Sequence, residues 1–213
     1  MVKGIIFDMD GVLIDSEPLH KKIERQMLLE LGVDLPHDEH VKFAGVGKEF
    51  WNIINNRFGY NREVTAESLH EEKHDRYLKA LSANPIIAIE GVIEVVAEAR
   101  RRNIPLAVAS SSSSHLIHLV LEAIGIDKDI SYVVSGEEVT NNKPFPDIFL
   151  RTAELMKIDP ESCLVVEDSA NGVKAAKDAG MFCVAFLNLN SGNQDLSNAD
   201  YIINSMAEVI KYF

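Results

Sequence analysis

Short apolar segments that alternate with amphipathic helical patterns constrain the fold of this chain more than any other feature. Apolar strands that are buried on both faces and separated by helices are typical of a parallel sheet. We therefore predict an α/β fold with a doubly wound, Rossmann-like parallel sheet, whose ligands lie beyond the carboxyl ends of the strands. The predicted strands are residues 2–7, 106–109, 132–134, 164–166, 183–186 and 201–203, and the helical patterns between them cover residues 91–102, 115–124, 147–156 and 170–179.

One segment, between the first predicted strand and Gly91, interrupts this alternation because it carries helical patterns and no convincing strand. Its first helix is expected over residues 18–31, with Ser16 as the N-cap and Pro18 in the first turn. Two more helices are expected over residues 48–58 and 65–81. The predicted division is an α/β core of residues 1–14 and 84–213 and an inserted α-helical cap domain of residues 15–83.

Composition narrows the class of partner. With 33 acidic and 21 basic residues the net charge is −12, so a nucleic-acid backbone or an anionic membrane would be repelled. The two cysteines, Cys163 and Cys183, lie inside apolar segments, which indicates buried free thiols and a cytoplasmic protein. No apolar segment is long enough to span a bilayer. The acidic charge does not decide between a monomer and a weak oligomer.

A run of five serines, Ser110–Ser114, follows a predicted strand and precedes a predicted helix. A flexible linker would be out of place there, and one serine, Ser113 or Ser114, is expected to cap the helix. The other hydroxyls and the free amides of the helix N-terminus suit an anion. Taken alone the run favours a helix cap, so its role depends on the neighbouring strand ends.

Acidic pairs follow two of the predicted strands. Asp8 and Asp10 leave the first strand, and Glu167 and Asp168 leave the strand of residues 164–166. In a parallel sheet both pairs lie on one carboxyl edge, with the serine run, and like charges held so close need a cation or a proton. Lys143 lies after another strand, where an ammonium would bridge the carboxylates and a phosphate. These residue types together indicate phosphoryl transfer.

Four sequence stretches, FDMDGVLIDSEPLH, VASSSSS, NNKPFPDIF and VVEDSANGVKAAKDAG, resemble the four ordered motifs of the haloacid dehalogenase superfamily, in its β-phosphoglucomutase-like phosphatase branch. The resemblance covers nearly the whole chain, including the cap. It implies that Asp8 is the nucleophile that forms an aspartyl phosphate. It also implies that Asp10 acts first as general acid and then as general base. An alcohol leaving group needs a proton and the attacking water then needs a base, which one carboxyl can supply in turn.

The same resemblance implies a Mg²⁺ cofactor and a phosphate-binding set. The ion would be held by Asp8, the backbone carbonyl of Asp10 and Asp168, with Glu167 acting directly or through water. The remaining implied residues are Ser110 and the backbone N–H of Ser111, which would hold the transferred phosphate, and Lys143, which would neutralise it.

The resemblance also implies the substrate, a small phosphorylated metabolite. It places five residues among cap and substrate contacts, namely His20, Gly45, Lys48, Lys73 and Ser112. Lys48 stands where related mutases have an arginine, and Ser113 and Ser114 stand where they have lysine and asparagine. A lysine cannot form the bidentate fork that holds a second phosphate. We therefore expect a phosphatase of sugar phosphates rather than a β-phosphoglucomutase that interconverts β-glucose 1-phosphate and glucose 6-phosphate.

Other interpretations remain open for some of these residues. His20, Lys48 and Lys73 also fit a solvated helix surface. His70 and His74 satisfy the H-E-x-x-H pattern of zinc peptidases, but their surroundings are highly charged and no third ligand follows in order. A non-catalytic metabolite-binding protein is disfavoured because no catalytic position of the family is substituted.

Overall fold

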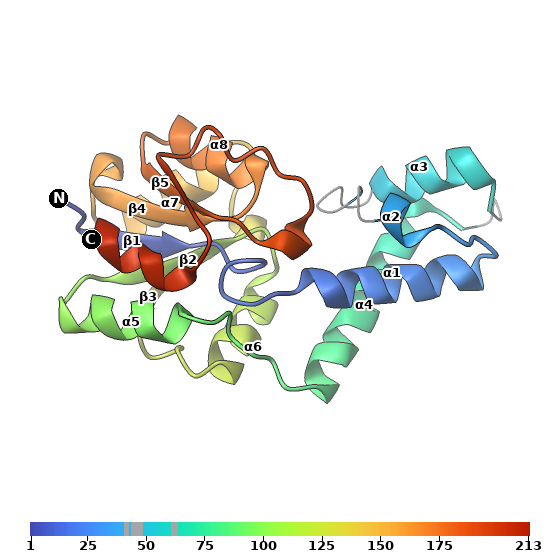
Figure 1. Ribbon diagram of the computed structural model, residues 1–213, viewed down its shortest axis with the longest axis horizontal. Coiled ribbons are helices and arrows are strands. Elements are labelled where there is room, and N and C mark those ends of the chain that lie inside the picture. The colour runs from blue at the N-terminus through green and yellow to red at the C-terminus, as the bar shows by residue number, and fades with distance from the viewer. Residues whose placement is uncertain (41–42, 44–48, 61–63) are drawn as a thin grey trace. The chain divides into compact units, whose positions relative to one another are not determined.

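The computed structural model describes residues 1–40, 43, 49–60 and 64–213. Its main feature is a six-stranded parallel sheet with the order β3-β2-β1-β4-β5-β6 (Figure 1). The predicted doubly wound α/β fold is confirmed, and all six predicted strands are present. They are β1 (Gly4–Phe7), β2 (Leu106–Ser110), β3 (Ile130–Ser135), β4 (Cys163–Glu167), β5 (Phe182–Phe186) and β6 (Tyr201–Ile203).

Burial differs between the middle and the edges of the sheet. Every residue of β1, β2 and β4 is buried. On the edge strand β6, by contrast, Tyr201 and Ile202 are 51% and 50% exposed. The first four residues of the other edge strand, β3, are also at least partly exposed. Full burial was expected for all strands and holds only for the central ones. The edge strands β3 and β6 each have a neighbouring strand on one side only, which leaves part of their surface exposed.

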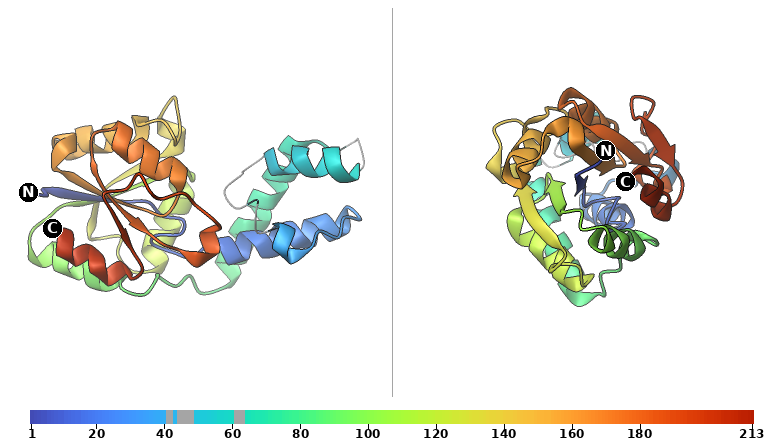
Figure 2. Two further views of the ribbon diagram at one scale, coloured as in Figure 1. Left: turned by 45° about the horizontal axis from the view of Figure 1, so that its top comes forward. Right: turned by 90° about the vertical axis from the view of Figure 1, so that its left-hand side faces the viewer.

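Four helices cover the faces of this sheet. They are α5 (Val92–Arg101), α6 (Ser114–Ala123), α7 (Asp147–Met156) and α8 (Ala170–Asp178). Helices α7 and α8 lie on one face, and α5 and α6 lie on the other (Figure 1 and Figure 2). In α5 the buried residues Val92, Val95, Val96 and Ala99 follow the spacing of one apolar helix face. Because all strand pairs are parallel, the carboxyl ends of the strands lie along one edge of the sheet.

A second compact unit is helical and comprises Ser16–Pro85 with Asn190–Asn193, whereas the sheet unit comprises Met1–Asp15, Ile86–Leu189 and Gln194–Phe213. The core of the helical unit is aromatic, with Trp51 and Tyr77 almost fully buried. A short second helix in it was not predicted. The helices of this unit are α1 (Glu17–Glu30), α2 (His37–His40), α3 (Glu49–Phe58) and α4 (Ala66–Ala83).

Helix capping in this unit differs from the prediction at Ser16. Ser16 precedes α1, but its backbone is already helical and its side chain makes no capping hydrogen bond. Thr65 in front of α4 forms the reciprocal cap instead, because its hydroxyl accepts from the Ser68 amide at 3.1 Å while the Ser68 hydroxyl accepts from the Thr65 amide at 3.2 Å. Among the described helices, none combines the length and the apolar character that a bilayer span requires.

Candidate active site

Three neighbouring strands end in polar residues at one edge of the sheet. Asp8 follows β1, Ser110 ends β2, and Glu167 ends β4 with Asp168 directly after it. Because β1 pairs with both β2 and β4, Asp8 lies between the other two strand ends. One carboxylate oxygen from each of Asp8, Glu167 and Asp168 lies within 4.8 Å of the other two. The strand order reverses between β1 and β4, which is where α/β proteins bind ligands.

Lys143 joins the acidic residues of this edge. Its ammonium donates to Asp8 Oδ1 at 2.6 Å, to Glu167 Oε1 at 2.7 Å and to the backbone oxygen of Ala109 at 3.1 Å. The ammonium also lies 5.0 Å from the centre of the Phe149 ring on α7. All three N–H donors are therefore used, and the charge is held in one place although only 7% of the side chain is exposed.

Glu167 is fixed by its own loop as well as by Lys143. Its Oε2 accepts from the amides of Asp168 and Ser169, both at 2.8 Å, and from the Ser169 hydroxyl at 2.9 Å. The Ser169 hydroxyl in turn accepts from the Gly172 amide at 3.0 Å and caps α8. A side chain at position 172 would meet Glu167, since a Cβ built there lies 1.7 Å from Glu167 Oε1. Gly172 thus leaves the space that this carboxylate occupies.

The charged groups of this cluster shift one another's pKa values. Burial raises the pKa of Asp8 to about 7, with Lys143 opposing the rise and Glu167 and Asp10 adding to it. Burial alone would lower the pKa of Lys143, but Asp8 and Glu167 outweigh it and move the pKa above the usual range. The lysine therefore stays charged, while the Asp8 carboxylate needs a further positive charge to stay ionised near neutral pH.

These residues fit a divalent cation. Asp8, Glu167 and Asp168 with Lys143 are three carboxylates and one ammonium, which leaves an excess of two negative charges when all are ionised. The donor set consists of oxygen atoms, as hard cations such as Mg²⁺ prefer. Within the part of the chain that the structure describes, this is the one group of three or more acidic, histidine or cysteine side chains with such spacing.

Asp10 lies two residues beyond Asp8 in a tight loop. The backbone oxygen of Met9 accepts from the amides of Val12, Leu13 and Ile14, and Gly11 takes a positive φ of 82° in this loop. The Asp10 side chain is half-buried, and its Oδ2 accepts from the Ser112 hydroxyl at 2.9 Å. Asp10 thus contacts the serine run, which places the ends of β1 and β2 in one site.

The serine run differs from the prediction at the helix cap. Helix α6 begins at Ser114, and Ser113 takes the predicted N-cap position with an extended backbone, but its side chain makes no capping hydrogen bond. The Ser114 amide donates instead to the Glu137 carboxylate at 3.2 Å. Glu137 can reach this helix end because it closely follows β3, and the last residue of β3, Ser135, pairs with Ser110 at the end of β2. A carboxylate at a helix N-terminus is also favoured by the helix dipole. The first serine, Ser110, is buried, and its hydroxyl accepts from the Ser112 amide at 3.1 Å.

Of the predicted cap and substrate residues, His20 and Lys73 lie in the helical unit, whereas Ser112 lies in the sheet unit. His20 on α1 stacks on Tyr77 of α4, with ring centres 4.0 Å apart. Lys73 donates to Glu24 at 2.5 Å, and the other oxygen of Glu24 lies 2.8 Å from His40 Nε2. Gly45 and Lys48 lie outside the described residues. Lys73 therefore has its charge paired within its own unit.

The H-E-x-x-H pattern lies on α4, where both His70 and His74 are exposed. Among the described residues, neither histidine belongs to a group of three or more acidic, histidine or cysteine side chains close enough to share a metal ion. An exposed pair of histidines without a third ligand does not make a catalytic zinc site. The zinc peptidase interpretation therefore gains no support.

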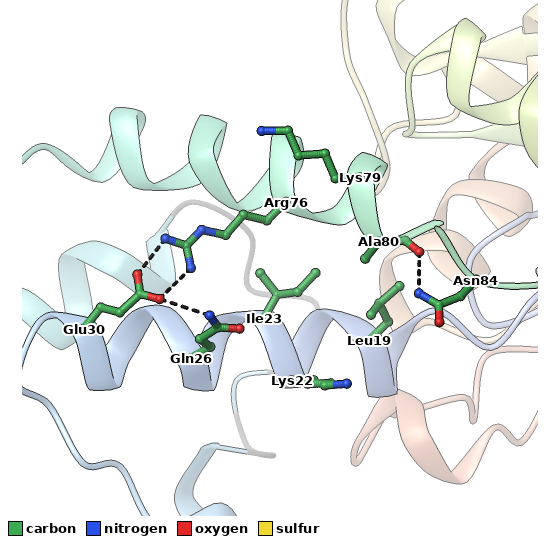
Figure 3. Close-up of a pocket in the computed structure, with 9 residues that line it drawn as sticks. All are labelled: Leu19, Lys22, Ile23, Gln26, Glu30, Arg76, Lys79, Ala80 and Asn84. Carbon is green, nitrogen blue, oxygen red and sulfur yellow. Dashed lines mark hydrogen bonds and ion pairs between the residues drawn. The ribbon is translucent and has the colours of Figure 1, made fainter. Parts of the chain in front are cut away.

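A groove of about 490 Å³ lies between α1 and α4 of the helical unit. Part of its polar lining is paired, as Figure 3 shows for Arg76, which reaches from α4 to both oxygens of Glu30 on α1, at 2.9 and 2.6 Å. Gln26 donates to the same glutamate at 3.1 Å. None of the predicted site residues lines this groove. The residues that line it are Leu19, Lys22, Ile23, Gln26, Glu30, Arg76, Lys79, Ala80 and Asn84.

Several residues that hold the site were not predicted. Ser169 and Gly172 could have been noticed in the sequence, because a serine is followed by a glycine inside the first turn of a helical pattern. Asn188 left no such signal, although its amide donates to the backbone oxygen of Gly11 at 3.1 Å and braces the loop after β1. Glu137 left none either, because its partner is twenty-three residues away in the chain.

Comparison with known proteins assigns the family. Residues 2–180 match the family model described as haloacid dehalogenase-like hydrolase. The chain therefore belongs to the haloacid dehalogenase-like hydrolases, an enzyme family, as its motifs predicted. A solved structure of CbbY from Rhodobacter sphaeroides, in complex with xylulose-(1,5)bisphosphate, has a TM-score of 0.83, 27% sequence identity and coverage of 98% of this chain and 96% of that one.

Curated relatives include phosphatases and a mutase. The chain is 33% identical to the fructose-1-phosphate phosphatase YqaB of Escherichia coli, over 85% of this chain and 94% of that protein. It is 31% identical to the phosphorylated carbohydrates phosphatase of Thermotoga maritima, over 98% and 100% of the two chains. A β-phosphoglucomutase of Bacillus subtilis is 25% identical over 98% and 92%. The chain spans only 18% of a longer relative, the chloroplastic protein SUPPRESSOR OF QUENCHING 1 of Arabidopsis thaliana, with 33% identity.

The fit between Gly172 and Glu167 gives a prediction about stability. Gly172→Ala should lower the free energy of unfolding by about 1–3 kcal/mol, because the added methyl group overlaps a carboxylate that several bonds hold in place. Gly4→Ala is the matched control, since a Cβ at Gly4 meets only the flexible ends of Ile158 and Met156. Urea unfolding measures both. Equal losses in the two variants would show that Glu167 is not held as described.

Proposed function

We propose that the chain is a magnesium-dependent phosphatase that hydrolyses small phosphorylated metabolites, sugar phosphates first, through an aspartyl phosphate on Asp8. The observation that carries the proposal is the ammonium of Lys143, which bonds Asp8 at 2.6 Å and Glu167 at 2.7 Å beside Asp168 and the end of β2. A buried carboxylate with a fixed cation beside it suits nucleophilic attack on a phosphate, because the cation offsets the charge of the incoming group. Family membership and the two phosphatase relatives support it.

The first half of the reaction transfers the phosphoryl group to the enzyme. A carboxylate oxygen of Asp8 forms a bond to phosphorus while the bond from phosphorus to the substrate oxygen breaks. The leaving oxygen takes a proton from the Asp10 carboxyl, and an alcohol departs. The Ser110 hydroxyl and the Ser111 amide would hold the phosphate oxygens during this step, and the charge of Lys143 would neutralise them.

The second half restores the enzyme. Asp10, now a carboxylate, takes a proton from water, and the water oxygen forms a bond to phosphorus. The bond between phosphorus and Asp8 breaks, which releases inorganic phosphate and the free Asp8 carboxylate. One side chain thus donates a proton and recovers it, and no further acid is required.

The metal would be held by the carboxylates of Asp8 and Asp168 and by the backbone carbonyl of Asp10. Mg²⁺ bound there supplies positive charge to the phosphate oxygens. Both oxygens of Glu167 already accept hydrogen bonds, from Lys143 on one side and from its own loop on the other. We therefore favour contact of Glu167 with the ion through water.

Simple hydrolysis is preferred over the mutase reaction because of the serine run. A mutase must hold a bisphosphate while it turns round, which requires cationic groups for the second phosphate. Ser113 and Ser114 carry no charge, and the backbone amide of Ser114 donates to the Glu137 carboxylate, which adds negative charge beside the run. The proposal extends to a cytoplasmic location, which the two buried free cysteines, Cys163 and Cys183, support.

Replacement of the nucleophile tests the proposal directly. Asp8→Asn should lower Mg²⁺-dependent phosphate release from sugar phosphates on the order of 10³-fold or more, because an amide cannot form the phosphoenzyme. Phosphate release is measured with wild-type protein and with Asp178→Asn, an exposed change on α8, as the control that stays active. Activity retained in Asp8→Asn would refute the role of Asp8 and the proposal with it.

A substrate panel separates the phosphatase from the mutase. We expect the protein to release phosphate from sugar monophosphates faster than it interconverts β-glucose 1-phosphate and glucose 6-phosphate in the presence of a bisphosphate primer. Both rates are measured on one preparation, by phosphate release and by coupled detection of glucose 6-phosphate. Faster interconversion would reverse the preference and assign the mutase activity.

A further inference from the structure

A chain of hydrogen bonds runs from the end of β3 to Asp10. Ser135 is fully buried, and its hydroxyl donates to the backbone oxygen of Ser112 at 2.7 Å. The same hydroxyl accepts from the Glu137 amide at 3.1 Å, so both its donor and an acceptor position are in use. Ser112 then donates its own hydroxyl to Asp10 Oδ2 at 2.9 Å. All of these residues belong to the sheet unit.

The Asp10 carboxyl is held less firmly than that of Asp8. No ion pair to Asp10 occurs among the described residues, whereas Asp8 contacts the Lys143 ammonium at 2.6 Å. Its second oxygen, Oδ1, is buried without a hydrogen-bond partner in the described part of the chain. The Ser112 hydroxyl is thus the one side-chain contact described for this carboxyl, and it determines which way the carboxyl faces.

We infer that Ser112 is a positioning residue for Asp10, and that Ser135 holds Ser112 in place. The inference rests on the proposed function, because it takes Asp10 as the group that carries the proton. The hydrogen bond to Oδ2 restricts rotation of the carboxyl, so that the group that gives and takes the proton keeps one orientation. A carboxyl free to rotate would spend part of its time out of reach of the leaving oxygen and of the water.

The two halves of the reaction allow this role to be separated from a substrate contact. p-Nitrophenolate leaves without a proton, so formation of the phosphoenzyme from p-nitrophenyl phosphate does not require Asp10 as an acid. Breakdown of the phosphoenzyme requires Asp10 as a base whatever the substrate was. Loss of the Ser112 hydroxyl should therefore slow the second half selectively when p-nitrophenyl phosphate is used.

The experiment uses rapid quenching of the Mg²⁺-loaded protein with p-nitrophenyl phosphate. In Ser112→Ala we expect a rapid release of about one equivalent of p-nitrophenol, followed by a steady rate about 10- to 100-fold below wild type. Phosphate bound to the acid-quenched protein should rise accordingly. Ser112→Thr keeps a hydroxyl and should recover most of the steady rate. Ser131→Ala, an exposed serine earlier on β3, is the matched control and should behave as wild type.

Two outcomes would overturn the role of Ser112. An increase in KM with unchanged kcat would make it a substrate contact, and unchanged phosphoenzyme breakdown would remove it from the reaction. Ser135 is tested by combining Ser135→Ala with Ser112→Ala. If Ser135 acts through Ser112, the steady rate of the double variant should be no lower than that of Ser112→Ala alone. Additive losses would overturn that part.

Failure of the inference can be told apart from failure of the proposed function. If Asp8→Asn turns over p-nitrophenyl phosphate, the proposed function fails. If Asp8→Asn is inactive, wild-type protein carries phosphate after quenching and Ser112→Ala turns over normally, the inference alone fails.

Discussion

The contact of the Lys143 ammonium with Asp8 and Glu167 is the interaction on which the rest of the site depends. Removing an ammonium from water costs several kcal/mol, and an attraction to carboxylates offsets this only where the geometry is good. Here two carboxylates at 2.6 and 2.7 Å and a backbone oxygen at 3.1 Å satisfy all three donors. A buried charge with every donor satisfied has little freedom to move, so it fixes the Asp8 and Glu167 carboxylates relative to each other.

The sheet makes this contact possible, and the loop after β4 maintains it. Lys143 lies 135 residues from Asp8 and 24 from Glu167, and it follows β3, so the pairing of β1 with β4, of β1 with β2 and of β2 with β3 brings the three together. Glu167 would be pulled toward the lysine if it had no other partner. The amides of Asp168 and Ser169 hold its second oxygen, and Gly172 provides the space, so the carboxylate is bonded from both sides.

The sequence predicts the strands, the core helices and the polar residues at the strand ends because each depends on a local pattern. Apolar runs, helical periodicity and acidic pairs at strand ends can all be read within about ten residues. The braces of the site depend instead on contacts between distant segments. Glu137 reaches the start of α6 across the pairing of β2 with β3, and its carboxylate accepts from the Ser114 amide, whereas the side chain of the N-cap residue Ser113 makes no capping bond. Asn188 contacts the loop after β1 for the same kind of reason, and no local pattern marks it.

Asp8 and Asp10 differ in their surroundings although they are two residues apart, and this difference supports their different roles. Asp8 is buried beside a cation, which favours a fixed nucleophile whose charge is compensated before and after attack. Asp10 is half-buried and contacts a neutral hydroxyl, which can orient a carboxyl in both its protonated and its ionised form. A cation in that place would hold Asp10 in the ionised form and oppose the protonated form that the leaving oxygen needs. A group that must alternate between two protonation states is therefore better oriented by Ser112 than by a lysine.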